Sequence, residues 1–361
     1  MSGRAGALGD AAATARLDQA IEAIAAEATW LDREPRFPVA AFRDLGDAGM
    51  LEATIGAVRS GDSVAPEWNL LRRVAAADAS VGRILDGHLN AVERLEVAAE
   101  PALRGRELAR LEGGRRLLGV WGADPGPGEG PPARLVDAGG DGLALRGAKT
   151  FCSGAGGVDA ALVLVGSDDG ASPRLALVEC VQVEIDRSWY RAAGLRASES
   201  HRVVFRDSPV LGILGEPGEM SRQPWFARDA MRTAASWVGM LDAAAAAAIA
   251  ELRRARSEEP LAQLAAGRIE ALLGTADAWL RRGAAAADDD GDPAPVSVAM
   301  RAEIDRAAKA LLEIAAAACG SHPFVTAGAL DRCRRDLETF LLQHRLDPLL
   351  TRLGAGRLAG R

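Results

Sequence analysis

The feature that most constrains the fold of this chain is a block of short strand-like runs placed between two helix-rich regions. Up to about residue 115, apolar residues such as Leu17, Ile21 and Ile24 recur at the spacing of a helix. From Arg115, short apolar or alternating runs follow one another, separated by clusters of Gly, Pro, Asp and Ser. From Pro224 onward, long Ala- and Leu-rich helical patterns return. Because few cofactor-binding folds have this order, it is the first constraint on function.

The central runs contain no periodic segment long enough for a helix, which favours an antiparallel sheet or barrel over alternating strands and helices. The expected strands are Leu117–Trp121, Leu143–Phe151, Ala160–Val165, Leu175–Cys180 and His201–Phe205. The expected helices are Leu70–Val92, Pro101–Leu111, Phe226–Arg254, Pro260–Arg282, Val296–Cys319 and Ala329–Leu342, with a solvated turn at Ala284–Pro295. The sequence therefore predicts an α+β chain with an N-terminal helical domain (1–115), a central β domain (116–223) and a C-terminal four-helix bundle (224–361).

Composition and charge exclude several classes of partner. The net charge of −7 argues against binding to the phosphate backbone of nucleic acids, which needs a basic face. Hydrophobic residues make up 48% of the chain and charged residues 26%, as in soluble globular proteins. Met1–Leu8 lacks the features of a signal peptide, and the Ala243–Ala248 run is too short to cross a membrane. We therefore expect a cytoplasmic protein with no membrane or nucleic-acid partner.

The cysteines and acidic runs do not form a metal-binding pattern. Cys152, Cys180, Cys319 and Cys333 are scattered with no C-x-x-C spacing, which indicates reduced thiols. The acidic run Asp288–Asp290 lacks the glycine and glutamate offsets of an EF-hand loop. No metal site is predicted.

Two glycine-containing stretches are candidates for ligand binding. Gly119–Gly130 is followed by two prolines, so no helix N-terminus is available for a pyrophosphate, and a dinucleotide fingerprint is disfavoured. Within Leu145–Asp159, a strand ends at Ser153 and offers backbone amides and a hydroxyl beside the aromatic ring of Phe151. Such a group can bind the edge of a flat heterocycle, and a simple hairpin with a glycine turn is the alternative interpretation.

Short motifs along nearly the whole chain, in a fixed order, carry a resemblance to a known family. They are Phe37-Pro38 followed by Leu45, Gly49 and Leu51; Ala123-Asp124-Pro125; Gly147 to Gly154; Gly194 to Ser198 followed by Val204 to Val210; and Cys319-Gly320 with Arg335-Asp336. Together with the order of helices, strands and helices, they resemble the acyl-CoA dehydrogenase superfamily. The resemblance implies an acyl-CoA dehydrogenase-like fold and a bound FAD.

The resemblance also implies which residues hold FAD. The positions expected to line the isoalloxazine ring are Trp121, Gly122, Ala123, Phe151 and Ser153. In this family a second subunit contributes to the pyrophosphate and adenosine of FAD. Arg254 and the pair Gly320 and Ser321 match those positions, with Arg256 as the alternative to Arg254. A site shared between subunits implies a homodimer or homotetramer.

The catalytic position of the family departs from its usual pattern. Acyl-CoA dehydrogenation needs a positioned base, commonly a glutamate eight residues after the aspartate of the Arg-Asp pair. Counted from Asp336, that position is His344, and an imidazole can exchange protons near neutral pH. Some members carry the base on an earlier helix, at a position that matches Asp229 here. His88 belongs to a region that approaches the flavin from the acyl-pocket side, and it is a further candidate.

Three functions remain open from the sequence. The first is an FAD-dependent oxidoreductase that acts on acyl-CoA or a related small substrate, with atypical proton-transfer residues and an electron-transfer partner. The second is a flavin-dependent monooxygenase or oxidase of the same fold, in which histidines manage protons. The third is a catalytically silent family member that serves as a partner subunit.

Overall fold

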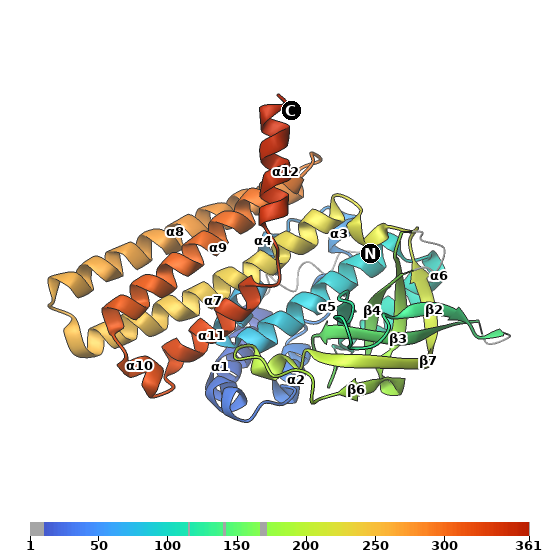
Figure 1. Ribbon diagram of the computed structural model, residues 1–361, viewed down its shortest axis with the longest axis horizontal. Helices are drawn as coiled ribbons and strands as arrows, with labels where there is room; N and C mark the ends of the chain where they lie inside the picture. The colour runs from blue at the N-terminus through green and yellow to red at the C-terminus, as the bar shows by residue number, and fades with distance from the viewer. Residues whose placement is uncertain (1–10, 115, 140–141, 167–171, 361) are drawn as a thin grey trace.

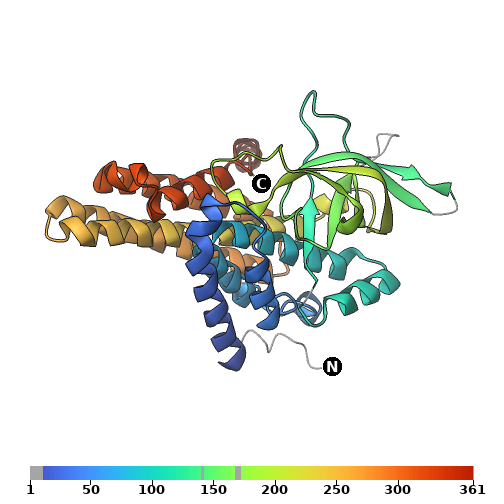
Figure 2. The same cartoon turned by 90° about the horizontal axis from the view of Figure 1, so that it is seen from below.

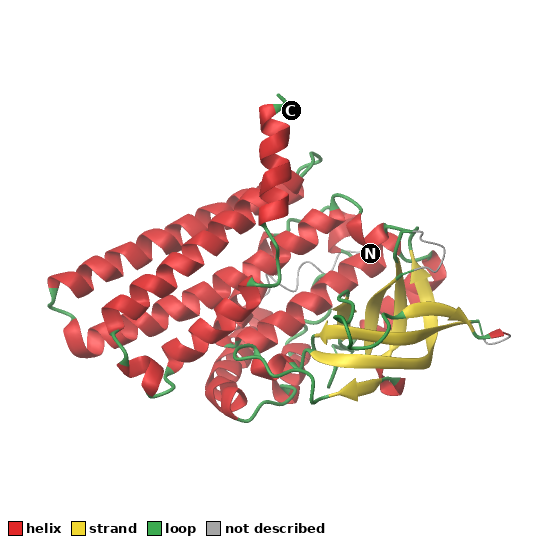
Figure 3. Cartoon of the chain, viewed as in Figure 1, coloured by secondary structure: helices red, strands yellow, loops and turns green. Residues whose placement is uncertain are grey.

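The computed structural model describes residues 11–114, 116–139, 142–166 and 172–360. It is an elongated molecule with a β-sheet at one end and long helices over the rest (Figure 3). Met1–Leu8, where we expect no signal peptide, and Arg115, where we place the first change of pattern, lie outside the described residues.

Helices make up the region before the sheet. They are α1 (Ala11–Arg33), α2 (Val39–Asp47), α3 (Ala57–Ser60), α4 (Ala65–Ala77), α5 (Ala79–Ala98) and α6 (Pro101–Leu111). The single helix expected over Leu70–Val92 is wrong, because Asp78 adopts an extended conformation between α4 and α5. The carboxylate of Asp78 accepts a hydrogen bond from the amide of Val81 at 2.9 Å and so caps the start of α5.

Over the described residues the sheet contains seven strands in the order β1-β4-β5-β7-β3-β2, with β6 paired to β7. The strands are β1 (Leu118–Trp121), β2 (Arg134–Asp137), β3 (Leu143–Cys152), β4 (Ala160–Val165), β5 (Arg174–Glu179), β6 (Glu184–Asp186) and β7 (His201–Leu214). The expectation of a purely antiparallel sheet is wrong, because β1 and β4 are parallel, with Leu118 opposite Ala160. The antiparallel pair β2 and β3 is inserted between them in sequence, which lets β4 return in the direction of β1.

Long helices follow the sheet. They are α7 (Trp225–Arg256), α8 (Pro260–Asp288), α9 (Ala294–Cys319), α10 (His322–Val325), α11 (Ala329–Leu341) and α12 (Asp347–Leu358). Helix α8 extends into the turn expected at Ala284–Pro295 and ends at Asp288, because Ala284 and Ala287 are buried against the neighbouring helices. Asp288 is not merely solvated, since its carboxylate accepts hydrogen bonds from the Ser63 hydroxyl and the Val64 amide at the start of α4. Helix α12 stands away from the bundle (Figure 1) and has no buried residue.

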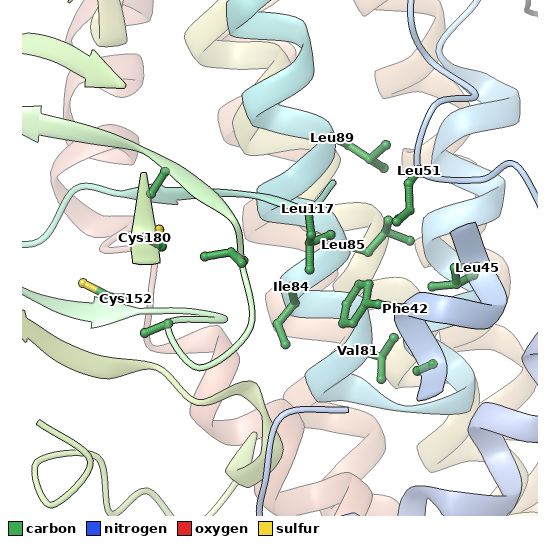
Figure 4. Packing of buried hydrophobic residues seen from close by; sticks show 14 of the residues in the cluster. Phe42, Leu45, Leu51, Val81, Ile84, Leu85, Leu89, Leu117, Cys152 and Cys180 are labelled. Atoms are coloured by element: carbon green, nitrogen blue, oxygen red, sulfur yellow. The ribbon is translucent and has the colours of Figure 1, made fainter. Parts of the chain in front are cut away.

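Helix α5 lies between the sheet and the C-terminal helices (Figure 2). On one side, Phe42 and Leu45 of α2 pack against Val81 and Leu85 of α5 in a cluster that continues into the sheet (Figure 4). On the other side, α5 packs against α7 and α11. All four cysteines are free, as expected. The sheet and the bundle are therefore joined through one buried helix.

Helix α7 is the centre of the C-terminal bundle. Its segment Trp225–Arg254 is long and apolar enough to cross a membrane, but 67% of the apolar window is buried inside the protein. The buried part also carries charged side chains, among them Arg228 and Arg232, that are paired with carboxylates. These features indicate the core helix of a globular fold.

Candidate active site

The open end of strand β3 presents an exposed aromatic ring in a strained conformation. Phe151 has a φ of +52° and is 59% exposed, although it lies next to fully buried Cys152. The pairing with β7 shifts register between Lys149 and Cys152, and this irregularity turns the Phe151 side chain outward. Its ring makes an edge contact with Trp189 at 4.9 Å. A non-glycine residue at positive φ is costly, which marks this position as a candidate for ligand contact.

The turn after β1 is fastened against β3 beside this ring. The amide of Thr150 donates to the carbonyl of Ala123 at 3.0 Å, and Lys149 pairs with Asp124 at 2.6 Å. The space next to the α-carbon of Gly122 is open. The structure thus brings Gly122 and Ala123 close to the end of β3 that carries Phe151, with open space beside the α-carbon of Gly122.

Trp121 does not take part in this open surface. Its side chain is fully buried and packs near Phe205, with ring centroids 6.5 Å apart. The indole N–H donates to the carbonyl of Ser153 at 3.1 Å. The ring of Trp121 therefore fixes the backbone after β3 from inside, and we correct its expected place at the flavin ring.

Ser153 belongs to a buried row of hydroxyl groups. The Oγ atoms of Ser153 and Ser200 are 2.9 Å apart, and those of Ser200 and Ser198 are 2.8 Å apart. Tyr190 lies beside this row, and burial is the main factor that raises its pKa. The row connects the end of β3 to the loop between β6 and β7 through hydrogen bonds.

Two motifs that are far apart in the sequence meet at this loop. The amide of Leu195 donates to the Asp336 carboxylate at 2.7 Å, and Arg335 donates to the carbonyl of Ala193 at 2.7 Å. A side chain at position 194 would collide with the backbone of Arg335, so the close approach requires Gly194. Burial raises the pKa of Asp336 to about 7. The loop between β6 and β7 is thus clamped to α11.

His344 lies just after α11, half-buried between three helices. Its ring is 5.0 Å from that of Trp237 in α7, and Nη1 of Arg301 in α9 lies 3.3 Å from Nδ1. Because a guanidinium can only donate, Nδ1 accepts and the ring proton resides on Nε2. Burial, followed by the positive charges of Arg301 and Arg83, lowers the pKa of His344 to about 3. The imidazole is therefore neutral at physiological pH.

The two arginines give the surroundings of His344 a positive character. Arg301 is 5% exposed, its Nε donates to the Ser297 carbonyl, and it has no carboxylate partner among the described residues. Burial lowers the pKa of Arg301 to about 10. Arg83 of α5 pairs with Asp86 at 2.8 Å and influences the pKa values of both His344 and Tyr190. The positive charge of Arg83 therefore acts on both His344 and Tyr190.

His88 is not in this pocket. It is fully buried within α5, where its Nδ1 accepts a hydrogen bond from the Leu118 amide at 3.1 Å and its Nε2 donates to the Leu51 carbonyl at 2.7 Å. Burial lowers its pKa to about 4. With both ring nitrogens engaged by backbone groups, His88 has no free atom for proton transfer, and we correct its expected catalytic role to a structural one.

Asp229 is likewise engaged inside the fold. Its carboxylate accepts from Nε of Arg94 at 2.9 Å and lies 3.5 Å from Nη1 of Arg232. Burial raises its pKa to about 7. Asp229 thus belongs to a buried charge network between α4, α5 and α7, and it is not a free base. The members of this charge network are Glu67, Glu93, Arg94, Arg228, Asp229 and Arg232.

The residues expected to hold the distal part of FAD lie at the opposite end of the molecule. Arg254, near the end of α7, is exposed and pairs with Glu251 at 2.7 Å. Gly320 and Ser321 follow α9, next to α10 at the end of the bundle away from the sheet (Figure 1). They cannot reach Phe151 of the same chain, so their role depends on a second copy and stays a prediction.

Sequence reasoning missed several residues of the site. Trp189 and Tyr190 precede β7 in a loop with no motif, although Tyr190 is the only tyrosine of the chain. Arg83, Trp237 and Arg301 come from three different helices. Helical spacing would have placed Trp237 on the buried face of α7, but nothing in the sequence indicates that it meets His344.

Comparison with known proteins identifies the fold. No protein-family model and no curated protein matches the chain. Among solved structures, FMN-bound TdsC from Paenibacillus sp. A11-2 is 20% identical with a TM-score of 0.86, and the alignment covers 97% of this chain and 98% of TdsC. Methanesulfinate monooxygenase MsuC from Pseudomonas fluorescens is 18% identical with a TM-score of 0.81, covering 96% of each chain.

A nitrososynthase from Micromonospora carbonacea var. africana is 23% identical with a TM-score of 0.76, covering 92% of each chain. The structural similarity extends over nearly the whole length of each chain. Because the sequence identities are low, it establishes a shared fold and no shared function. The chain has the acyl-CoA dehydrogenase-like fold of these proteins.

Proposed function

We propose that the chain is a flavin-dependent monooxygenase or oxidase, the second of the functions that the sequence leaves open. The observation that carries this proposal is His344, a neutral imidazole beside two arginines at the position where the dehydrogenases have a glutamate. TdsC, described as a dibenzothiophene monooxygenase, and MsuC have the same fold. These likenesses support a monooxygenase over an acyl-CoA dehydrogenase.

The residues present fit a flavin ring. The open space at Gly122, the backbone of Ala123 and the exposed ring of Phe151 provide a surface for a flat heterocycle, and Ser153 offers a hydroxyl. We favour FMN over the FAD expected from the sequence. TdsC and KijD3 were crystallised with FMN, and Arg254, expected at the FAD pyrophosphate, is already paired with Glu251.

The charge network argues against a long acyl chain as the substrate. Six charged side chains occupy the space between α4, α5 and α7, next to Asp86 and Thr233. Opening an apolar channel there would leave buried charges without partners, which costs several kcal/mol, roughly 3–5 for each broken pair. We therefore infer a small substrate that does not extend between these helices.

The side chains around His344 can donate a hydrogen bond and stabilise negative charge. A bound reduced flavin would supply electrons to oxygen. His344 has a free Nε2–H that can donate a hydrogen bond, while its low pKa keeps it from holding a second proton at rest. Arg301 and Arg83 stabilise negative charge that develops beside the imidazole. The ring of Trp237 packs against both His344 and Phe340.

The proposal is tested with flavin supplied in both redox states. Purified protein is mixed with FMN or FAD, and binding is followed by flavin fluorescence. FMN reduced by a flavin reductase and NADH is then added, and oxygen use and substrate oxygenation are measured. We expect FMN to bind and His344→Ala to lose substrate oxygenation, while Arg345→Ala, at the exposed neighbouring position, retains it.

Three results would contradict the proposal. Loss of flavin colour on addition of an acyl-CoA without oxygen would establish the dehydrogenase with its electron-transfer partner. Failure to bind either flavin would favour the silent partner subunit. Unchanged oxygenation in His344→Ala would remove the histidine from the site.

We keep two further predictions. A homodimer or homotetramer would bring Arg254 and Gly320 of one copy toward the site of another, and light scattering on the purified protein tests this. A cytoplasmic location remains the expectation from the sequence and is tested by cell fractionation.

A further inference from the structure

One buried arginine of this fold has no acidic partner. Among the described residues, the buried arginines are Arg94, Arg228, Arg232 and Arg301, each at most 9% exposed. The first three pair with carboxylates of the charge network. Arg301, 5% exposed, forms no ion pair with any described residue. Because a buried charge is costly unless it is paired, Arg301 calls for an anion that the described part of the chain does not supply.

The guanidinium of Arg301 is also incompletely hydrogen-bonded. A guanidinium has five N–H donors. Nε of Arg301 donates one to the Ser297 carbonyl at 3.1 Å, and Nη1 donates one to Nδ1 of His344 at 3.3 Å. The other N–H groups, one on Nη1 and both on Nη2, have no partner in the described ranges. Unlike the indole nitrogen of Trp237, which is enclosed without a partner, Nη2 keeps accessible surface and can receive a ligand.

The charges around Arg301 leave one positive charge in excess. Helices α7, α9 and α11 pack side by side here (Figure 1). Burial lowers the pKa of Arg301 to about 10, so the group stays charged at neutral pH. The charges that act on neighbouring His344 are those of Arg301 and Arg83, both positive. Arg83 is offset by Asp86 at 2.8 Å, which leaves the charge of Arg301 unbalanced.

We propose that Arg301 binds the carboxylate of the substrate, which is a small organic monoanion. This inference rests on the proposed function, because it names the class of substrate at the same site. The free N–H groups stand on adjacent nitrogens of one planar fork, and such a fork donates to both oxygens of a carboxylate. A substrate held at Arg301 lies beside His344, whose Nε2–H is the group proposed for the chemistry.

Charge balance favours a carboxylate over a phosphate ester. Arg301 supplies a single unpaired positive charge, whereas a phosphate ester carries close to two negative charges at neutral pH. Lys149, in the strand that carries Phe151, cannot supply the second, because it is paired with Asp124 at 2.6 Å. For the same reason Arg301 is not assigned to the phosphate of FMN.

Calorimetry on the full chain without flavin tests the proposal, with sodium propionate and sodium benzoate as probes. Propionamide and benzamide are their neutral counterparts, and sodium chloride supplies an inorganic anion. We expect saturable binding of at least one carboxylate, and binding of its amide at least tenfold weaker. In proton NMR the ring signals of His344, assigned with His344→Ala, should shift on addition of that carboxylate, while those of His88 should not. This contrast locates the probe beside Arg301.

Variants of Arg301 separate its charge from its shape. Arg301→Met should weaken binding of the carboxylate at least tenfold, since it removes a charged hydrogen-bond donor. It should remain folded, as checked by circular dichroism, because it removes a buried charge that has no partner. Arg301→Lys keeps the charge without the planar fork and should weaken binding about threefold to tenfold. Arg345→Met, at the exposed position next to His344, is the control and should bind as the wild type does.

Several results would overturn the proposal. These are no binding of either carboxylate, equal binding of the amide, undiminished binding in Arg301→Met, displacement by chloride at equal concentration, or unshifted His344 signals.

FMN binding, followed by fluorescence on the same samples, separates this inference from the proposed function. We expect Arg301→Met to bind FMN as the wild type does. Loss of FMN binding in this variant would assign Arg301 to the flavin and overturn the inference. A wild-type protein that binds the carboxylate through Arg301 but binds no flavin would contradict the proposed function and leave the anion site in place.

Discussion

Burial lowers the pKa values of both His88 and His344, but the fold holds their rings in opposite ways. His88 bridges β1 and the segment after α2, since each ring nitrogen bonds to a buried backbone group. His344 is half-buried after the last turn of α11 and has one long contact, with Arg301 at 3.3 Å. The ring of His88 is therefore part of the structural framework, whereas the ring of His344 has a free N–H close to arginine side chains.

The difference teaches that burial and a lowered pKa do not identify a catalytic histidine. Burial lowers the pKa of both rings, to about 4 for His88 and about 3 for His344. What separates them is whether the ring atoms are already used. A residue whose hydrogen-bonding groups are all engaged contributes stability, whereas an incompletely satisfied one is available for chemistry.

The largest expected effect is on stability, from His88→Ala. The change leaves the Leu118 amide and the Leu51 carbonyl buried without partners, at about 1–3 kcal/mol each, and adds a cavity. We expect the free energy of unfolding to fall by about 3–6 kcal/mol in urea denaturation followed by circular dichroism. A loss below about 1 kcal/mol would show that His88 is not a structural bridge. Where His88→Ala fails to fold, the milder His88→Gln serves for the same measurement.

The next effect is on activity, from His344→Ala. We expect at least a tenfold loss of substrate oxygenation, equivalent to about 1.4 kcal/mol of transition-state stabilisation. The free energy of unfolding should change by less than about 1 kcal/mol, because the ring makes a single long hydrogen bond. If stability falls as much as in His88→Ala, the contrast between the two histidines is wrong.

The pH dependence of stability should distinguish the rings further. The pKa of His88 is lower in the folded state, about 4, than its ordinary value of 6.5, so the unfolded chain takes up the proton first as the pH falls. The contribution of His88 is therefore complete above pH 6.5 and is lost toward pH 4. We expect the stability difference between wild type and His88→Gln to shrink by about 2 kcal/mol from pH 7 to pH 5. A constant difference would contradict the lowered pKa.

The smallest effect concerns the charge beside His344. Arg301→Met removes one of the positive charges that lower the pKa of the imidazole, so this pKa should rise toward its ordinary value. Proton NMR of the histidine rings, with His344→Ala for assignment, measures the midpoint. Arg345→Met, at an exposed neighbouring position, is the control and should leave the midpoint unchanged. A midpoint unaffected by Arg301→Met would mean that Arg301 does not contribute to the lowered pKa of His344.

Much of the fold follows from local sequence patterns. Helical spacing predicts α6, α7, α9 and α11 to within a few residues, and a short apolar run predicts β4 at its observed bounds. The break at Asp78 was missed because the helical pattern continues through a residue that caps the next helix. The parallel pairing of β1 and β4 was missed because strand direction depends on the long connection between them, which no local pattern records.

Local motifs named residues that the fold brings close together, whereas contacts between distant segments left no pattern in the sequence. Gly122 and Ala123 follow β1, Phe151 and Ser153 stand at the end of β3, and the two segments are hydrogen-bonded to each other. Their role at a flavin stays a prediction. The setting of His344 depends on Arg301, 43 residues earlier in the chain. The structural role of His88 depends on backbone groups at positions 51 and 118, which side-chain patterns do not reveal.

The charge network between α4, α5 and α7 has a consequence for anyone who wishes to redesign the interior of this protein. Each arginine in it shares its carboxylates with a neighbour, as Arg228 and Arg232 share Glu93. A single replacement leaves the remaining buried charges without partners. Replacement of the whole set by hydrocarbon side chains of matched volume can leave the stability unchanged or increase it. Mutational libraries aimed at this region should therefore change the charged side chains of the network together. Variants with a single replacement are destabilised, so a screen that replaces one residue at a time would discard them before an apolar core is reached.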